Sequence, residues 1–172
     1  MLPQWLDPRK LAHQNARFQG LVGPENLPRL ADAVAQLAPV TAVLRFAINE
    51  GGVPVVEGES MAEVGLVCQR CLMPMAEGIS ATFTVGVVAD ELGATDLPPQ
   101  MDPWVVNEAV ADVYALIEDE LLLALPMIPM HPLEQCCAQT ATVADDALSV
   151  SRQKPFDVLR QLKTSNAKVL NG

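Results

Sequence analysis

The stretch Asn107 to Cys136, NEAVADVYALIEDELLLALPMIPMHPLEQC, constrains the fold most, because it predicts one buried helix with both ends marked. Wound as an α-helix over Asp112 to Leu125, the chain gathers its large apolar side chains on one face: Val113, Ile117, Leu121 and Ala124, flanked by Leu116 and Leu123. Asp112 is suited to capping the first turn, and Pro126 cannot continue the helix. Burial of this face makes the helix the expected nucleus of the core.

A proline-spaced arm follows the helix, since Pro126, Pro129 and Pro132 recur at every third residue. This is the spacing of a polyproline II turn, so we expect an extended arm running over the surface of the core. Between the prolines, Met127, Ile128 and Met130 are expected to pack down as anchors. A rigid strap of this kind is favoured over a ligand for a peptide-recognition domain.

Three adjacent acids, Glu118, Asp119 and Glu120, lie on the predicted helix. The helical wheel turns Glu118 and Asp119 away from the apolar face and Glu120 into it, where a carboxylate must take up a proton or pair with a cation. Arg70 is the one basic residue among seventeen acids between positions 46 and 149. We therefore predict a salt bridge between Arg70 and Glu120 or a neighbouring acid of the triplet. The alternative is that Arg70 only decorates a hairpin tip.

Two short helices and a strand are predicted in the first forty residues. Asp7 followed by Pro8 opens a helix through about Gln14, and Phe18 to Val22 alternates as a strand does. Asn26 is expected to cap a second helix that Pro39 ends. Its apolar side is formed by Leu27, Leu30, Val34 and Leu37.

Strand signals follow one another from position 40 to position 87. Leu44, Phe46 and Ile48 alternate with polar or smaller residues before a turn over Asn49 to Gly52. A return strand over Val53 to Glu57 is expected at an edge, because Pro54 cannot donate a hydrogen bond. Further alternation covers 62–68 and 79–87, and a loop covers 90–103. The fold class is α+β, an antiparallel meander or partly closed barrel packed against two or three helices.

Length and composition bound the organisation of the chain. With 172 residues and 50% hydrophobic content, we expect one domain over 1–137, a flexible linker over 138–154 and a basic tail over 155–172. The start, MLPQWLDPRK, lacks the apolar region of an export signal, and the longest apolar run is broken by prolines. We expect a cytoplasmic protein whose four cysteines are reduced or bound to metal rather than joined as disulfides.

Charge is divided unevenly along the chain, which has a formal net charge of −10. Residues 1–45 carry +2, residues 46–149 carry −16 and residues 150–172 carry +4. An acidic body repels phosphate, so broad binding of nucleic acid by the body is not expected. The alternative interpretation is that acidity only keeps a hydrophobic chain in solution.

Cys68-Gln69-Arg70-Cys71 is a C-x2-C motif at the predicted turn between two strands. In a zinc knuckle two thiolates at such a hairpin tip share one metal, and His131 with Cys136 or Cys137 could complete a tetrahedral site. Three interpretations remain open: one structural zinc, reduced thiols packed as small hydrophobes, or a redox pair. The redox interpretation has the least support, because no pattern places Cys68 at a helix N-terminus.

The hairpin CQRC, the segment EDELLLALPMIPMH and the terminal PFDVLRQLK, in this order, resemble the YceD family, the large ribosomal RNA subunit accumulation proteins of bacteria and plastids. The resemblance runs over nearly the whole chain and implies a non-enzymatic cytosolic factor needed for synthesis, processing or accumulation of 23S ribosomal RNA. The matching positions are Cys68, Arg70, Cys71, Glu118 to Glu120, Pro126, Pro129, His131, Phe156, Leu159 and Leu162. Departures from the family pattern are Lys154 and the doubled Cys136-Cys137, which leaves the fourth metal ligand open.

The end of the chain is expected to be a linker and a docking peptide. Residues 138–153 are small and polar, and Phe156, Leu159 and Leu162 form one stripe beside Arg160 and Lys163. A helix this short needs a surface, either its own domain or a partner.

Two functions follow from these patterns. The first is a ribosome-biogenesis adaptor for large-subunit ribosomal RNA or a ribosomal protein. Its candidate contact residues are Arg70, Glu118, Asp119, Glu120, Phe156, Leu159, Leu162 and Lys163. The second is a metal-dependent nuclease acting on precursor ribosomal RNA, although adjacent acids on a helix diverge by about 100° and cannot converge on one atom.

Overall fold

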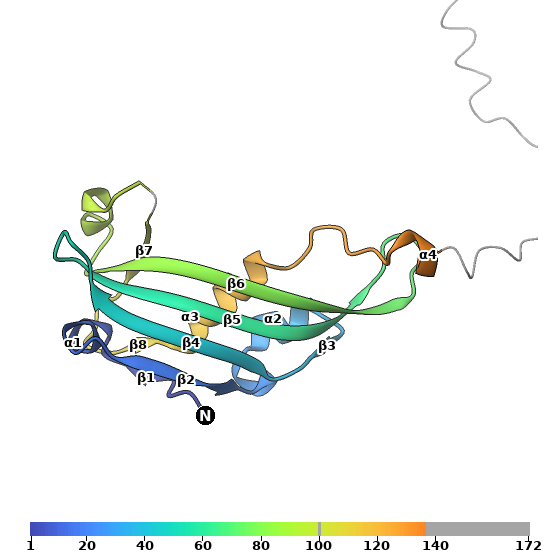
Figure 1. Ribbon diagram of the computed structural model, residues 1–172, viewed down its shortest axis with the longest axis horizontal. Helices are drawn as coiled ribbons and strands as arrows, with labels where there is room; N and C mark the ends of the chain where they lie inside the picture. Colours follow the sequence, from blue (N-terminus) through green and yellow to red (C-terminus); the bar gives the residue numbers. More distant parts are fainter. Residues whose placement is uncertain (100, 137–172) are drawn as a thin grey trace, which may run out of the picture. The chain divides into compact units, whose positions relative to one another are not determined.

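The computed structural model describes residues 1–99 and 101–136, so the predicted linker over 138–154 and tail over 155–172 lie outside the described residues. The main sheet of the described chain has the strand order β2-β4-β5-β6-β7, and β3 also pairs with β5 (Figure 1). The pairings are antiparallel except the one between β6 and β7, which is parallel. The predicted α+β class is therefore confirmed, with a mostly open sheet.

The sheet is built from strands of very different lengths. They are β2 (Arg17–Val22), β3 (Gln36–Leu37), β4 (Val40–Ile48), β5 (Pro54–Val67), β6 (Pro74–Val88) and β7 (Asp102–Val105). A separate pair joins β1 (Trp5–Leu6) to β8 (Ala111–Asp112). Because β5 and β6 are the longest strands, their hairpin extends beyond the rest of the sheet, and its turn lies at one end of it (Figure 1).

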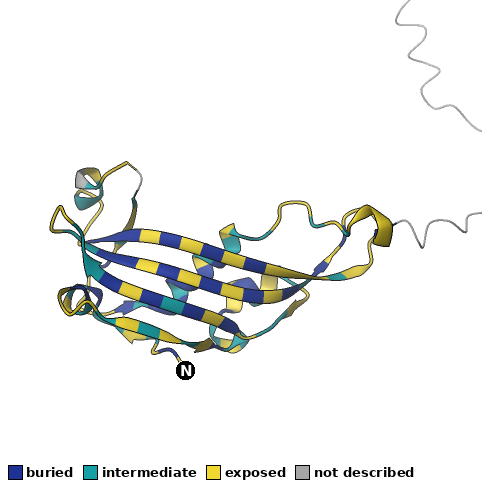
Figure 2. Ribbon diagram, in the orientation of Figure 1, coloured by how far each residue is buried: buried dark blue, intermediate teal, exposed yellow. Residues whose placement is uncertain are grey.

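One face of the sheet is buried and the other faces solvent, as the alternating colours in Figure 2 show. The buried positions on β4 are Val40, Ala42, Leu44 and Phe46, and between them lie exposed or half-buried residues. Helices α2 (Pro28–Ala33) and α3 (Val113–Leu123) lie on the buried side (Figure 1). Period-two alternation of this kind is expected when one face of a sheet forms the core.

Helix α3 confirms the predicted core helix. Asp112 accepts hydrogen bonds at Oδ1 from the backbone N–H groups of Tyr114, at 2.9 Å, and Ala115, at 3.3 Å, and so caps the first turn. Val113, Ile117 and Leu121 are completely buried. Leu123, in contrast, is 82% exposed and does not flank the buried face as predicted, because the last turn of α3 presents that side to solvent.

The first helix and strand are also confirmed. Helix α1 (Pro8–His13) is capped by Asp7, whose Oδ1 accepts from Lys10 N at 2.9 Å. The second predicted helix is wrong in length. Residues Pro24–Asn26 form a 3-10 turn, η1, and α2 ends at Ala33. The chain leaves the helix early because β3 pairs with β5, and Ala35 N and Ala38 N donate to Gly65 O and Glu63 O.

The predicted edge strand over Val53 to Glu57 is wrong, since β5 is a single strand lying between β4 and β6. Pro54 is tolerated because it is the first residue of the strand, where the missing N–H costs little. A second 3-10 turn, η2 (Gly93–Asp96), precedes β7 in the predicted loop. No helix in the described part of the chain is long and apolar enough to cross a membrane.

The proline-spaced arm leads from α3 to the short helix α4 (Leu133–Cys136). Its expected anchors do not pack down: Met127 is 98% exposed, and Ile128 and Met130 are also exposed. The arm is instead attached through its backbone, because Gln69 N donates to Pro129 O at 2.9 Å. The prolines fix φ at their own positions, and the apolar side chains between them lie in solvent.

Candidate functional site

The turn between β5 and β6 carries two cysteines. Cys68 follows the last residue of β5 and is fully buried, and Cys71 is half-buried. The turn is closed by Cys68 N donating to Met73 O at 3.0 Å and Leu72 N donating to Cys68 O at 2.9 Å. The C-x2-C motif therefore lies at the tip of a long hairpin, as predicted.

The arm brings two further ligand atoms to this tip. Met130 and Pro132 flank His131, whose backbone N–H donates to Cys68 Sγ at 3.4 Å. Helix α4 starts directly afterwards, and Cys136 N donates to Pro132 O at 3.1 Å. This single turn of helix points Cys136 back toward the hairpin, where its side chain is buried.

The four side chains form one compact cluster, the Cys/His cluster of Cys68, Cys71, His131 and Cys136. Cys68 Sγ lies 4.0 Å from Cys136 Sγ, and Cys71 Sγ lies 3.3 Å from His131 Nδ1. All four ligand atoms lie within 4.8 Å of one another. In a tetrahedral zinc site with Zn–S bonds of about 2.3 Å, two sulfurs are separated by about 3.8 Å. The cluster could therefore hold a metal ion with little rearrangement.

Local hydrogen bonding prepares one thiol for metal binding. Burial by itself raises the pKa of Cys68, but the backbone N–H groups of Cys71, His131 and Arg70 donate to its sulfur and lower the pKa to about 5. Burial and the neighbouring thiols raise the pKa of Cys136 to about 11. N–H donors around one sulfur of a C-x2-C turn favour a thiolate there, and thiolates are the form that binds zinc.

The structure thus brings together Cys68, Cys71, His131 and Cys136, all of which the sequence nominated from segments about sixty residues apart. Cys137, the other candidate for the fourth ligand, lies outside the described residues. The sulfur separation of 4.0 Å is far above the disulfide bond length of about 2.05 Å, so Cys68 and Cys136 are free thiols here.

The acidic triplet has a different partner from the predicted one. Arg29 Nε donates to Glu118 Oε2 at 2.8 Å, and Arg29 Nη1 lies 2.7 Å from Asp119 Oδ1. Glu118 Oε1 also accepts from the backbone N–H of Leu30 at 3.0 Å. Glu118 is only 4% exposed, although the helical wheel turned it away from the apolar face. A helical wheel considers only the residues of α3 itself. Glu118 is buried because α2 packs against the side of α3 that carries it.

The predicted salt bridge from Arg70 to the triplet is wrong. Arg70 is exposed at the hairpin tip, where its Nη2 lies 3.5 Å from Met130 Sδ. Glu120 is half-buried, and burial together with Asp102 and Asp119 raises the pKa of its carboxyl. Arg29 was missed because it lies 89 positions from Glu118 and belongs to a helix whose orientation the sequence did not give.

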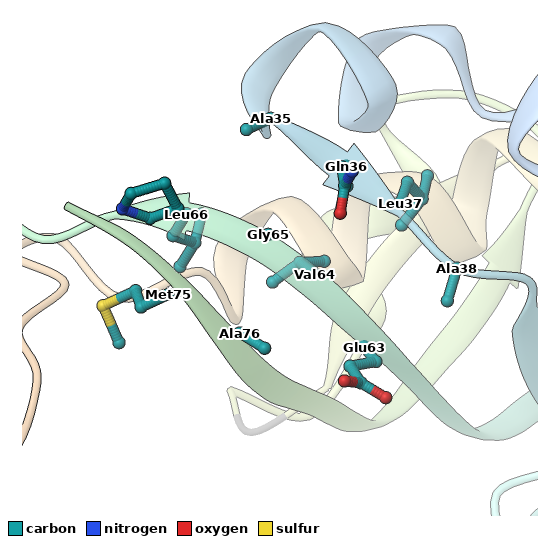
Figure 3. A pocket seen from close by; sticks show the side chains of 11 residues that line it. Ala35, Gln36, Leu37, Ala38, Glu63, Val64, Gly65, Leu66, Met75 and Ala76 are labelled. Atoms are coloured by element: carbon teal, nitrogen blue, oxygen red, sulfur yellow. The ribbon is translucent and has the colours of Figure 1, made fainter.

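A groove of about 840 Å³ opens beside the hairpin, between the β3 segment and the ends of β5 and β6 (Figure 3). It is lined by Ala35 to Ala38, Glu63 to Leu66 and Pro74 to Ala76. Glu63 is the one ionisable residue among these, so the groove offers no acid/base pair.

The fold and the cluster define a class of small α+β proteins in which an extended arm returns to the tip of a long β-hairpin and completes a cysteine and histidine cluster there. Residues 56–163 match the family described as "Large ribosomal RNA subunit accumulation protein YceD". The chain belongs to this family. It is 34% identical over 168 residues to the "Large ribosomal RNA subunit accumulation protein YceD" of Haemophilus influenzae, covering 94% of this chain and 96% of that protein. No solved structure gives a significant match.

Proposed function

We propose that the chain is a non-enzymatic cytoplasmic factor required for the synthesis, processing or accumulation of 23S ribosomal RNA. The observation that carries this proposal is membership of the YceD family, supported by the name of a relative that aligns over nearly its whole length. Within that role the chain acts as an adaptor that holds a ribosomal protein or RNA. The acidic stretch from 46 to 149 favours a positively charged partner over direct gripping of RNA by the body.

The contacts of the acidic triplet argue against a nuclease role. Metal-dependent nucleases need free carboxylates that converge on one or two cations. Both oxygens of Glu118 accept hydrogen bonds from α2, and Asp119 pairs with the same arginine. These carboxylates hold two helices together, so the nuclease alternative has no support from this site.

The adaptor proposal includes two further elements. The first is the basic end of the chain, where Phe156, Leu159, Leu162 and Lys163 would dock on a partner through a short helix tethered by the 138–154 linker. The second is one structural zinc ion held by Cys68, Cys71, His131 and Cys136. The donor set of three cysteines and one histidine, with sulfurs at near-tetrahedral separation, supports the second.

Deletion of the gene, followed by measurement of the 23S to 16S ribosomal RNA ratio, tests the role. We expect the ratio to fall and to be restored by the wild-type gene and by a Glu120→Gln gene. In parallel, purified protein is incubated with precursor ribosomal RNA, which should stay intact. A deletion that leaves the ratio unchanged, or cleavage of the precursor that disappears with Glu120→Gln, would overturn the proposal.

A further inference from the structure

The hairpin tip and the arm expose an unusual number of large apolar side chains. In the described residues, seven such side chains belong to the two short segments 67–73 and 127–133, and we refer to them together as the apolar platform. They are Val67, Leu72, Met73, Met127, Ile128, Met130 and Leu133. Contiguous exposed apolar surface on a protein marks a site of interaction with another macromolecule.

The two segments are held against each other. Gln69 N donates to Pro129 O at 2.9 Å, and within the Cys/His cluster Cys71 Sγ of one segment lies 3.3 Å from His131 Nδ1 of the other. Prolines at 126, 129 and 132 restrict the arm further. A surface ordered before binding loses less entropy when a partner docks, which favours binding.

Leu72 carries a second, independent sign of function. Its φ is 60°, in the left-handed region that glycine adopts readily and leucine rarely, and its side chain is 72% exposed. An exposed leucine in this conformation contributes little to the core and is held at a conformational cost. The cost is understandable if the side chain is needed for contact with a partner.

A hollow of about 310 Å³ lies next to the platform, between the end of α2, the end of β5 and the arm. Its lining has no ionisable residue: Ala33, Val34, Ala35, Leu66, Val67, Gln69, Leu125, Pro126 and Pro129. A hollow of this size accepts one or two apolar side chains, as the central pockets of protein interfaces do. Three exposed methionines of the platform, Met73, Met127 and Met130, offer adaptable apolar surface.

Charge decides which kind of partner fits. The platform belongs to the described part of the acidic stretch, residues 46–136, in which Arg70 is the single basic residue among fifteen acids. The guanidinium of Arg70 lies beside Met130, within the platform itself. Because the acids of the stretch far outnumber Arg70, its net field repels phosphate groups and draws a positively charged segment toward the domain. At the platform itself the expected contacts are apolar rather than ionic.

From these observations we infer that the apolar platform is the docking surface for a positively charged protein segment whose large apolar side chains enter the hollow and cover Leu72. The inference rests on the proposed adaptor function and specifies its partner as a basic protein rather than RNA. Leu72 is the specificity contact, and Met127, Ile128 and Met130 extend the contact along the arm.

A photo-crosslinking experiment with the full chain tests this inference. A benzophenone amino acid replaces Met127 in one variant and Leu92, which is 79% exposed near η2 at the other end of β6, in a control. Each is irradiated with the proteins extracted from purified large ribosomal subunits, and separately with protein-free 23S RNA. We expect a product from position 127 with a basic protein, mapped by mass spectrometry to a segment with large apolar residues. Position 92 should give none.

Two glycine variants, Leu72→Gly and its control Leu92→Gly, test whether the crosslinked product depends on the Leu72 side chain. Leu72→Gly removes the side chain and suits the left-handed backbone, so the fold should be kept or stabilised while the yield of the product falls about tenfold. Leu92→Gly should leave the yield unchanged. Crosslinks to RNA, to a second copy or to the same chain, no product above the position 92 control, or a product insensitive to Leu72→Gly would each overturn the inference. The 23S to 16S ratio in the deletion strain reports on the adaptor function separately.

Discussion

Arg29 and Glu118 form the contact that joins α2 to α3, with Arg29 Nε donating to Glu118 Oε2 at 2.8 Å. The carboxylate is almost completely buried, while the arginine side chain is about half exposed. Because Glu118 also accepts from Leu30 N, it fastens α2 by both a side chain and a backbone group. The first acid of the Glu118-Asp119-Glu120 triplet therefore has a structural partner within the chain.

Glu118→Ala is expected to lower the free energy of unfolding by about 2 to 4 kcal/mol, because two hydrogen bonds to a buried charge are lost and Leu30 N is left without its acceptor. Asp119→Ala is the matched control, since it removes an exposed carboxylate from the same arginine and should cost less than about 1 kcal/mol. Urea unfolding measures both. If the two substitutions lowered the free energy of unfolding equally, Glu118 would not be the carboxylate that holds α2 to α3.

Glu120→Gln is expected to raise the melting temperature at neutral pH. Burial, Asp102 and Asp119 raise the pKa of Glu120, so the folded chain holds this proton at a higher pH than the unfolded chain does. The wild type therefore gains stability relative to Glu120→Gln as the pH falls through the raised pKa, and the advantage of the variant disappears in acid. Thermal melts from neutral to acidic pH, with Glu59→Gln on the exposed face of β5 as a control, measure the difference. If the difference in melting temperature between Glu120→Gln and the wild type grew as the pH fell, the pKa of Glu120 would not be raised in the folded chain.

Ser60→Ala is expected to stabilise the protein by about 1 kcal/mol. In the described residues, Ser60 Oγ is the one buried side-chain oxygen or nitrogen with no hydrogen-bond partner, and an unpaired buried hydroxyl costs free energy. Ser80→Ala, on the exposed face of β6, is the control and should have almost no effect. Urea unfolding distinguishes the two, and destabilisation by Ser60→Ala would show that the hydroxyl has a partner in solution.

Gly58→Ala is expected to destabilise the sheet by about 1 to 3 kcal/mol, because the added Cβ would lie 2.0 Å from Cζ of the Phe83 ring. Phe83 is buried opposite Gly58 and has little room to move. Gly78→Ala, on the neighbouring strand, is a matched control, since nothing lies within 4 Å of its Cβ position. If both substitutions had the same effect on the melting temperature, the contact would not be responsible.

The sequence predicted those elements whose signals are local. Asp7 with Pro8 and Asp112 with Pro126 mark helix ends through their own chemistry, and both helices are present. The alternation from position 40 onward predicted β4 and most of β6. The four residues of the Cys/His cluster were also found, because a C-x2-C turn restricts where the remaining ligands can lie.

The errors concern contacts between distant parts of the chain. The single strand β5 runs through Gly58 because it pairs with β4 on one side and β6 on the other, and these pairings join distant positions. The partner of the acidic triplet could not be chosen correctly, since it depends on where α2 packs. The exposure of Met127 and Ile128 was missed because periodicity reveals apolar side chains without showing whether anything covers them.

The zinc content of the purified protein tests most directly whether the Cys/His cluster joins the arm to the hairpin. Elemental analysis of protein reconstituted with zinc and freed of excess metal should give about one zinc per chain for the wild type and for Cys137→Ser. Cys136→Ser, which removes a ligand of the cluster, should lose the metal and melt at a lower temperature. A wild-type chain that retains no zinc, or a Cys136→Ser chain that retains it while Cys137→Ser does not, would contradict the proposed site.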